Sequence, residues 1–374
     1  PSQMEAMAAL ESVVSIDKGG KQQPMMYFAR SAANADPVLE GTGAGLDKAY
    51  KGAGVVAGLM DQGLDPNHVA FQNADQTANR VKQVYYYMTE GVAGEPSASY
   101  ITPEEIANAA TDYSGWTHGT HVCSIMAGGY NGPSTFGLNG RVQETQPMPY
   151  YGLASDADIV MTGGILYDDN ILDGVERVID YAKSVNKPAV VNLSLGSTVG
   201  PHDGSSAFCR YLAGLGEDAI ICVAAGNDAD TKCAWSPSFN RFNTEAITGI
   251  SMTNPGEVVS AEFWYNLEDA FGFSFMLYNM NTGKFTETYK IHTSDETFAK
   301  AFVRGSQVQV YANVDPVNKR YYVRMRMAAI LNDESYVPCV KVAGKNKASI
   351  LATISNGQFE TLGIPGASSG SANG

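Results

Sequence analysis

The sequence lacks the long hydrophobic runs and the positive charge that would suit a membrane or a nucleic acid. No run of 18 or more consecutive apolar residues occurs, which excludes a strongly hydrophobic helix long enough to span a bilayer. Charged residues make up only 17% of the 374 residues and apolar residues 44%, which is the composition of a folded protein. The formal net charge of −14 repels nucleic acid and anionic lipid, so we expect neither as a partner.

Cysteine is also scarce, and its spacing excludes one common kind of metal site. The five cysteines contain no Cys-x-x-Cys pair, so a zinc cluster is not expected. Cys222 lies in the apolar run 219–223, which predicts a small buried thiol. Cys209 and Cys233 remain candidates for a disulfide, because sequence alone does not establish the distance between them. The sequence begins with Pro1 and shows no basic segment followed by an apolar one, so no export signal is recognisable.

The middle of the chain alternates apolar strands with amphipathic helices. The predicted strands are residues 54–60, 157–161, 189–193 and 219–224. The predicted helices are residues 118–128, 169–184 and 205–214. Near-continuous apolar runs are typical of strands covered on both faces, as in a parallel sheet. This alternation predicts a doubly wound α/β fold.

The rest of the chain has a different character. From residue 251 to 355, aromatic and alternating segments are separated by turn signals, which predicts an inserted or appended β-sandwich domain. We expect its aromatic residues to form sandwich core rather than a platform for a ligand. These aromatics are Phe263, Trp264, Tyr265, Tyr321 and Tyr322. Residues 1–45 are irregular apart from a short helix predicted over 3–13, and residues 356–374 are expected to be a flexible Gly/Ser-rich tail.

Three polar segments lie where predicted strands end or helices begin, which is where open α/β sheets form their sites. Asp61 directly follows an apolar strand, where a rigid, partly buried carboxylate can orient an imidazole. His118 opens a predicted helix, and the neighbouring Gly119 allows another backbone to approach closely. Asn227 follows the strand predicted over 219–224, and its amide can donate to a developing oxyanion. Each of these residues alone is more often an ordinary turn or helix residue.

Together and in this order, the segments resemble the subtilisin family of serine peptidases. The resemblance rests on the strand ending in Asp61, on His-Gly-Thr-His-Val at 118–122, on Ser-Leu-Gly at 194–196 and on Ala-Ala-Gly-Asn at 224–227. It implies a subtilisin-like catalytic domain over residues 46–250. Residues 1–45 would then be an N-terminal extension packed on that domain.

The resemblance also implies a role for each matching residue. Asp61 would orient the imidazole of His118, which would act first as general base and then as general acid. Asn227 would complete the oxyanion hole. The segment Ser194-Leu195-Gly196 would form an edge to which a polypeptide substrate adds as a β-strand, with the segment near Tyr167 and Asp168 facing it. The implied reaction is hydrolysis of internal peptide bonds through an acyl-enzyme, and the implied location is secreted or extracytoplasmic.

Three features depart from the family pattern. Gln62 stands where family members usually have Thr or Ser after the aspartate. Residues 251–355 have no counterpart in the minimal fold and would be inserted between the oxyanion asparagine and the nucleophile. The family's Gly-Thr-Ser-Met-Ala segment is absent, and Ser368 and Ser371 have no helix-forming segment after them. We therefore expect the nucleophilic serine on a missing C-terminal segment or a separate chain, and this chain alone to be inactive.

Two other functions stay open. A catalytically silent, subtilisin-like binding module would have no chemical need for the carboxylate, the imidazole and the amide together. A metal-dependent hydrolase could use His118 and His121 on one helix face, but the Glu of a metallopeptidase motif is missing.

The implied mechanism requires no cofactor. Structural calcium is nevertheless common in subtilisin-like proteins, where loop carboxylates and carbonyls hold it. Asp65, Asp75 and Asp112 are candidates among the aspartates expected on the surface, but solvated acidic loops are the simpler interpretation.

Overall fold

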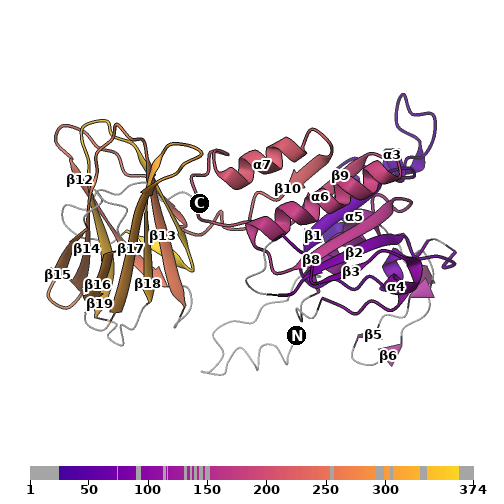
Figure 1. Ribbon diagram of the computed structural model, residues 1–374, viewed down its shortest axis with the longest axis horizontal. Helices are drawn as coiled ribbons and strands as arrows, with labels where there is room; N and C mark the ends of the chain where they lie inside the picture. The colour runs from indigo at the N-terminus through magenta and orange to yellow at the C-terminus, as the bar shows by residue number, and fades with distance from the viewer. Residues whose placement is uncertain are drawn as a thin grey trace, which may run out of the picture.

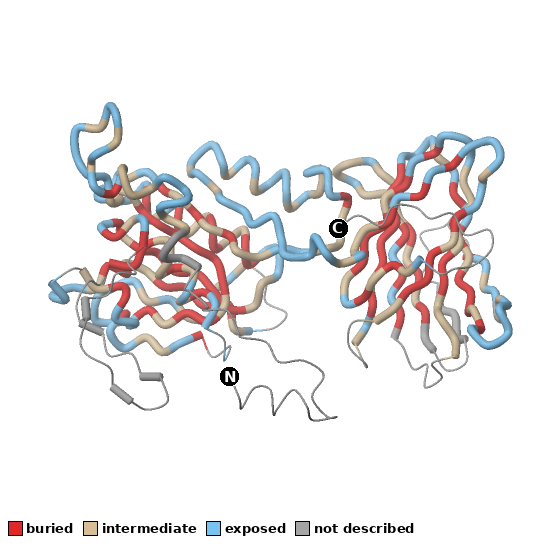
Figure 2. Tube along the Cα trace, turned by 180° about the vertical axis from the view of Figure 1, so that it is seen from behind, coloured by how far each residue is buried: buried red, intermediate tan, exposed pale blue. Residues whose placement is uncertain are grey.

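The computed structural model describes residues 25–73, 75–89, 94–112, 115, 117–129, 133–134, 137–138, 141–142, 146–147, 152–252, 257–291, 299–303, 306–328 and 335–361. They form an α/β body and an all-β body, which the segment 224–233 connects (Figure 1). Buried residues concentrate in these two bodies, and much of the chain between them is exposed (Figure 2). The helix predicted over residues 3–13 lies outside the described residues.

The α/β body is built on a six-stranded sheet in the order β10-β9-β1-β8-β2-β3. Its strands are β1 (Val56–Asp61), β2 (Val81–Tyr87), β3 (Ala98–Tyr100), β8 (Asp158–Gly164), β9 (Ala189–Leu193) and β10 (Ile220–Val223). The pairs from β10 to β2 are parallel, and β3 runs antiparallel to β2. The four predicted strands and the doubly wound α/β arrangement are therefore confirmed, while β2 and β3 are additional.

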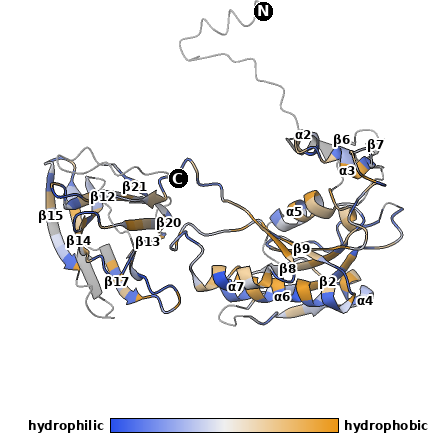
Figure 3. Ribbon diagram, turned by 90° about the horizontal axis from the view of Figure 1, so that it is seen from above, coloured by the Kyte–Doolittle hydropathy of each residue, from blue (hydrophilic) through white to orange (hydrophobic). Residues whose placement is uncertain are grey.

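Helices cover both faces of this sheet. α5 (His118–Ala127) lies on one side, and α6 (Asp168–Ser184) and α7 (Ala207–Leu215) lie on the other (Figure 3). The stripe of Ile171, Val175 and Val178 on α6 is buried, as its helical spacing predicts. β1 approaches α6 closely at Gly58, where a Cβ would lie 2.3 Å from Val178 Cγ1.

Shorter elements complete the α/β body. They are α2 (Met25–Ala32), α3 (Asp36–Glu40), the 3₁₀ helix η1 (Val69–Phe71), α4 (Pro103–Ala107), β4 (Pro133–Ser134), β5 (Gly137–Leu138), β6 (Arg141–Val142) and β7 (Gln146–Pro147). None of the helices within the described residues is long and apolar enough to cross a membrane.

The structure answers three expectations about the fourth predicted strand and the cysteines. β10 is an edge strand, and Ile220 and Val223 are exposed, so it is not covered on both faces as predicted. Cys222, predicted to be a buried thiol, is exposed because it lies on this edge strand. Cys209 and Cys233 are both free, so they form no disulfide.

The all-β body consists of two antiparallel sheets around one hydrophobic cluster. One sheet contains β11 (Ala234–Trp235), β20 (Ile350–Ser355), β13 (Val258–Tyr265), β18 (Tyr321–Ala328), β17 (Ser306–Val314) and β16 (Ala299–Val303) in that order. The other contains β15 (Lys284–Ile291), β14 (Gly272–Asn279), β19 (Tyr336–Ala343), β12 (Glu245–Met252) and β21 (Gly357–Glu360). The strands thus begin at Ala234, earlier than the change in composition at residue 251.

Residues 357–360 form a strand, although they were expected in a flexible tail. β21 pairs antiparallel with β12. Phe359 on this strand is 1% exposed and belongs to the cluster between the sheets, so its burial stabilises the strand. The remainder of the predicted tail, residues 362–374, lies outside the described residues, together with Ser368 and Ser371.

The aromatic residues of β13 and β18 divide between two faces. Phe263 and Tyr265 belong to the shared cluster, and Tyr321 packs against it. Trp264 and Tyr322 stack at 4.8 Å outside that cluster, because successive side chains of a strand point to opposite faces. The prediction of sandwich core is therefore confirmed for Phe263, Tyr265 and Tyr321. Trp264 is also buried, at 5% exposed, but it packs on the half-buried Tyr322 at the opposite face of the sheet.

Candidate active site

Asp61 is the last residue of β1 and is 3% exposed. Its Oδ1 accepts a hydrogen bond from the backbone N–H of Gln62 at 2.6 Å. Among the described residues its Oδ2 is buried without a hydrogen-bond partner. Burial raises the pKa of the Asp61 carboxyl, while the bonds from His118 and Gln62 act in the opposite direction.

His118 is the first residue of α5, and its ring reaches Asp61. The distance from His118 Nδ1 to Asp61 Oδ1 is 2.7 Å. An ionised carboxylate only accepts hydrogen bonds, so beside one Nδ1 is the donor, and Nε2 takes no part in this bond. The His118 side chain is 51% exposed, so this second nitrogen is accessible to a reacting group.

The start of α5 is fastened directly to the end of β1. The backbone N–H of Gly119 donates to Gln62 O at 2.6 Å, and that of Thr120 donates to Gly63 O at 3.0 Å. These carbonyls satisfy N–H groups at the helix start, where Thr117 provides no side-chain cap. A Cβ on Gly119 would lie 2.6 Å from Leu64 Cδ2 and 2.9 Å from Gln62 O, so only glycine fits without displacement. The close backbone approach predicted at Gly119 is therefore confirmed.

Asp112 was expected on the surface, but it supports the loop after β1. It is 1% exposed, and its Oδ2 accepts a hydrogen bond from the backbone N–H of Gly63 at 2.6 Å. Asp75 is exposed and binds Thr77 within its own loop, while the backbone N–H of Asp65 donates to Thr120 Oγ1. Within the part of the chain that the structure describes, no group of three or more His, Cys, Asp or Glu is placed to hold a metal ion.

The second histidine of the motif has different surroundings from the first. His121 is exposed and lines a cavity of about 650 Å³ together with His68 and Asp65. His118 is not among the described residues that line this cavity. The structure therefore pairs His118 with Asp61 rather than with His121.

The segments expected to bind substrate flank Asp61 on both sides. β9 leads into Ser194-Leu195-Gly196, and β8 leads into Gly164–Tyr167. Both strands are parallel neighbours of β1, so their carboxyl ends lie at the same edge of the sheet as Asp61. Tyr167 occupies the N-cap position of α6 without a capping side-chain hydrogen bond and is 52% exposed. A Cβ on Gly196 would meet nothing within 4 Å.

Asn227 lies beyond the carboxyl end of β10, at the same edge. Leu59 is level with Asn192, and Asn192 is level with Cys222, across β1, β9 and β10. The backbone N–H of Ala224 donates to Leu193 O at 3.0 Å, so the ends of β9 and β10 stay together at this edge. Asn227 is exposed in the loop that follows, after Gly226 at φ +97°.

Gln62 has a role that sequence reasoning missed. Its Nε2 donates to the carbonyl oxygen of Gly164 at 2.9 Å, linking the loop after β1 to the end of β8. The long amide reaches a neighbouring strand, which the Thr or Ser usual in the family is too short to do. No local signal could have revealed this bond, because the two residues are 102 positions apart.

Comparison with known proteins gives a family and several partial relatives. The chain is 28% identical to the subtilisin-like protease PopC of Myxococcus xanthus over 214 residues, which are 50% of this chain and 36% of PopC. It is 30% identical to the C5a peptidase of Streptococcus pyogenes serotype M18 over 198 residues, 49% of this chain and 16% of that protein. It is 26% identical to a subtilisin of Bacillus sp. strain TA39 over 235 residues, 60% of this chain and 46% of that protein. The chain thus spans less than half the length of each of these relatives.

The fold has a counterpart among solved structures. The CspB protease of Clostridium perfringens matches with a TM-score of 0.64 and 21% sequence identity, covering 84% of this chain and 65% of that chain. At this identity the match shows a shared fold. Residues 52–358 also match the model of the subtilase family. Because that match covers most of the 374 residues, the chain belongs to the subtilase family of serine peptidases.

Proposed function

We propose that the protein is a serine endopeptidase of the subtilisin type, which cleaves internal peptide bonds of polypeptides through an acyl-enzyme. The observation that carries this proposal is the 2.7 Å contact between Asp61 Oδ1 and His118 Nδ1 at the carboxyl edge of a parallel sheet. A buried carboxylate bonded to one nitrogen of an exposed imidazole is the arrangement that activates a serine.

Each group has one task in the proposed mechanism. His118 Nε2 takes the proton of the serine hydroxyl as its oxygen attacks the scissile carbonyl carbon, and Asp61 stabilises the imidazolium that forms. The side-chain amide of Asn227 donates to the oxyanion of the tetrahedral intermediate. His118 then protonates the departing amine. Water attacks the acyl-enzyme with His118 again as base, which restores the serine.

The nucleophilic serine is proposed to lie outside the printed 374 residues. The sequence has no Gly-Thr-Ser-Met-Ala segment, and among the described residues no serine hydroxyl is hydrogen-bonded to the His118 ring. The serine would come from a further C-terminal segment or a separate chain. The all-β body is then a domain inserted between Asn227 and the nucleophile, and this chain alone is inactive.

The substrate is proposed to lie extended between the two segments that flank Asp61. Its backbone would pair with Ser194-Leu195-Gly196 on one side and with Gly164–Tyr167 on the other. The open space beside Gly196 leaves room for a second backbone. A secreted location and a structural calcium ion stay predictions that rest on the family resemblance.

The test uses the full-length protein that includes the serine. We expect it to be labelled by a fluorophosphonate probe and to hydrolyse an unfolded protein such as casein. His118→Ala should lower the turnover by a factor of about 10²–10⁴, because it removes the general base. His121→Ala is the matched control, since it removes an exposed histidine of the same helix without affecting the Asp61 bond.

Two outcomes would contradict the proposal. A full-length protein that neither reacts with the probe nor cleaves polypeptides would instead be a silent binding module. Activity that disappears on chelation, and is lost in His121→Ala as in His118→Ala, would indicate a metal-dependent hydrolase.

A further inference from the structure

The segment that follows the proposed substrate edge has little structure of its own. Residues 197–206 connect Gly196 to α7 and contain three backbone positions with positive φ: Gly200 at +121°, His202 at +51° and Gly204 at +74°. Among the described residues, no backbone–backbone hydrogen bond is made by residues 197–205. Side-chain bonds within the segment, such as that of His202 Nε2 with Thr198 O at 3.0 Å, act together with bonds to other parts of the molecule to hold its conformation.

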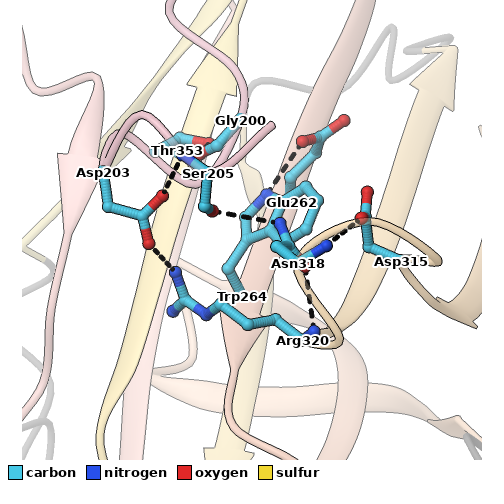
Figure 4. A network of polar contacts seen from close by, with 9 residues as sticks. All are labelled: Gly200, Asp203, Ser205, Glu262, Trp264, Asp315, Asn318, Arg320 and Thr353. Atoms are coloured by element: carbon cyan, nitrogen blue, oxygen red, sulfur yellow. Dashed lines mark hydrogen bonds and ion pairs between the residues drawn. The ribbon is translucent and has the colours of Figure 1, made fainter. Parts of the chain in front are cut away.

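Two hydrogen bonds from β20 of the all-β body hold the first half of this segment. Thr198 Oγ1 donates to the carbonyl oxygen of Ile354 at 2.7 Å. Thr353 Oγ1 donates to the carbonyl oxygen of Gly200 at 3.3 Å (Figure 4). Thr353 is 0% exposed, so its hydroxyl is fixed inside the protein. Thr198 stands only two residues after the substrate edge, so its position determines where Gly196 lies.

The turn between β17 and β18 holds the second half of the segment. Asn318 Nδ2 donates to Ser205 Oγ at 3.2 Å, and Arg320 Nη1 contacts Asp203 Oδ2 at 2.7 Å (Figure 4). This turn has a hydrogen bond of its own, in which Asp315 Oδ1 accepts from the backbone N–H of Asn318 at 2.9 Å. Both halves of the segment are therefore attached to the same sheet.

β20 also holds the chain that follows Asn227. The backbone N–H of Ile354 donates to the carbonyl oxygen of Cys233 at 3.0 Å. The next two residues, Ala234 and Trp235, form β11 and pair with β20. Ile354 therefore binds both segments. Its carbonyl accepts from Thr198, after the substrate edge, and its backbone N–H donates to Cys233, after Asn227.

From this arrangement we propose that β20 is a positioning element for peptide binding, which sets the substrate edge relative to the asparagine loop through Thr198 and Cys233. The inference rests on the proposed function, because it assumes that the edge positioned by the all-β body binds a polypeptide substrate. Backbone pairing with an extended peptide requires an edge that is already in place, and a displaced edge weakens peptide binding. Thr198 is accordingly a positioning residue that acts through Gly196.

The kinetic test compares Thr198→Val with Thr198→Ser in the full-length protein. Valine has nearly the shape of threonine but cannot donate, so KM for a peptide that extends several residues before the scissile bond should rise about three- to tenfold. The kcat for this peptide and the rate of fluorophosphonate labelling should stay near wild type, because neither depends on the length of the paired edge. Thr198→Ser keeps the hydroxyl and should restore the wild-type KM.

A second measurement uses the 374-residue chain and needs no activity. Endoproteinase Asp-N cuts before aspartate, and Asp203 lies in the middle of the held segment. Cleavage at Asp203 should be about three- to tenfold faster in Thr198→Val than in wild type or Thr198→Ser, because it follows the population of the released segment. Lys341→Met is the control, since it breaks the Lys341–Glu245 ion pair of the all-β body away from this segment.

The inference is overturned if Thr198→Val matches wild type in cleavage at Asp203, or if Lys341→Met accelerates that cleavage equally. It is also overturned if an active full-length protein shows an unchanged KM for the extended peptide. A full-length protein that neither labels nor hydrolyses peptides would refute the proposed function. The cleavage experiment would still decide whether β20 holds this segment.

Discussion

The proposed mechanism needs Asp61 to be ionised, but Asp61 is buried, and burial disfavours the ionised form. In the proposed mechanism, the ionised carboxylate would stabilise the imidazolium of His118 during the reaction. Burial nevertheless raises the pKa of the Asp61 carboxyl, so the folded protein disfavours the charged form. The unpartnered Oδ2 within the described residues is part of the same conflict. The site therefore lowers the stability of the fold at neutral pH.

This conflict predicts how stability changes with pH. An acid whose pKa is raised by folding holds its proton in the native state at pH values where the unfolded chain has lost it. The contribution of Asp61 to the free energy of unfolding is therefore fully present below its pKa in the unfolded chain, about 3.9. It is lost as the pH rises through its higher pKa in the folded protein. In Asp61→Asn the free energy of unfolding should exceed that of wild type by about 0.5–2 kcal/mol at pH 7, with the difference disappearing below pH ~4. Urea unfolding of this chain between pH 3 and 8 measures it.

Asp75 supplies a control of opposite sign. Its bonds from Thr77 lower the pKa of the Asp75 carboxyl, so its contribution is present at neutral pH and is lost as pH falls. Asp75→Asn should therefore lower stability at pH 7 and converge with wild type in acid. An Asp61→Asn variant less stable than wild type at pH 7 would show that hydrogen bonding, rather than burial, dominates at Asp61.

At the scale of elements, the contact between β1 and α5 holds the two proposed catalytic side chains together. The helix is bonded at its start to Gln62 and Gly63. At its end, the guanidinium of the buried Arg80 donates to the carbonyl oxygen of Ala127, which satisfies a free carbonyl and suits the negative end of the helix. Both ends of α5 are therefore fastened, and the geometry of Asp61 and His118 depends on how closely the helix approaches the strand.

Gly119→Ala should disturb this approach. Its Cβ would lie 2.6 Å from Leu64 Cδ2 and 2.9 Å from a backbone carbonyl, so the helix start must move. We expect a loss of about 1–3 kcal/mol in the free energy of unfolding, together with a large loss of peptidase activity in the full-length protein. Gly214→Ala on α7 is the control, since a Cβ there meets nothing within 4 Å. It should stabilise the chain by up to about 1 kcal/mol, so equal losses in both variants would contradict this account.

The elements that could be predicted from sequence are those in which buried apolar residues form a regular pattern or a continuous run. The stripe on α6 and the apolar run of β1 have such a repeat, so both were predicted nearly to their ends. β2 was missed because Lys82 and Gln83 interrupt its apolar pattern, and its pairing with β8 supplies the missing stability. β10 is apolar but lies at an edge, and the position of a strand in its sheet cannot be read from its own residues.

The same limit applies to the site. The proximity of Asp61 and His118 was predictable from the resemblance to the subtilisin family, which rests on the order of the matching segments, and the structure places the two side chains 2.7 Å apart. The supports of the site were not predictable. Asp112 reaches Gly63 across 49 positions, and Thr198 reaches Ile354 across 156. An aspartate in a loop or a threonine after a strand has no local pattern that identifies such a partner.

At the scale of the whole molecule, the chain buries its apolar residues in separate places. One cluster fills the space between the two sheets of the all-β body, and two others cover the faces of the α/β sheet. Each body can therefore open without exposing the core of the other, although β20 contacts the segments around the proposed site.

Reciprocal glycine variants test whether the two bodies open independently. In Gly344→Ala the new Cβ would lie 2.5 Å from Phe271 Cε1, within the all-β core. A destabilisation of about 1–3 kcal/mol should make amide exchange in β13, β14 and β19 about five- to a hundredfold faster, because these amides exchange through opening of their own body. Exchange in β1 and β8 should remain near wild type, and Gly119→Ala should give the reverse pattern in hydrogen-exchange mass spectrometry. If either variant accelerated exchange equally in both sets of strands, the molecule would open as one cooperative unit, and the junction at β20 would couple the two cores as well as position the proposed site.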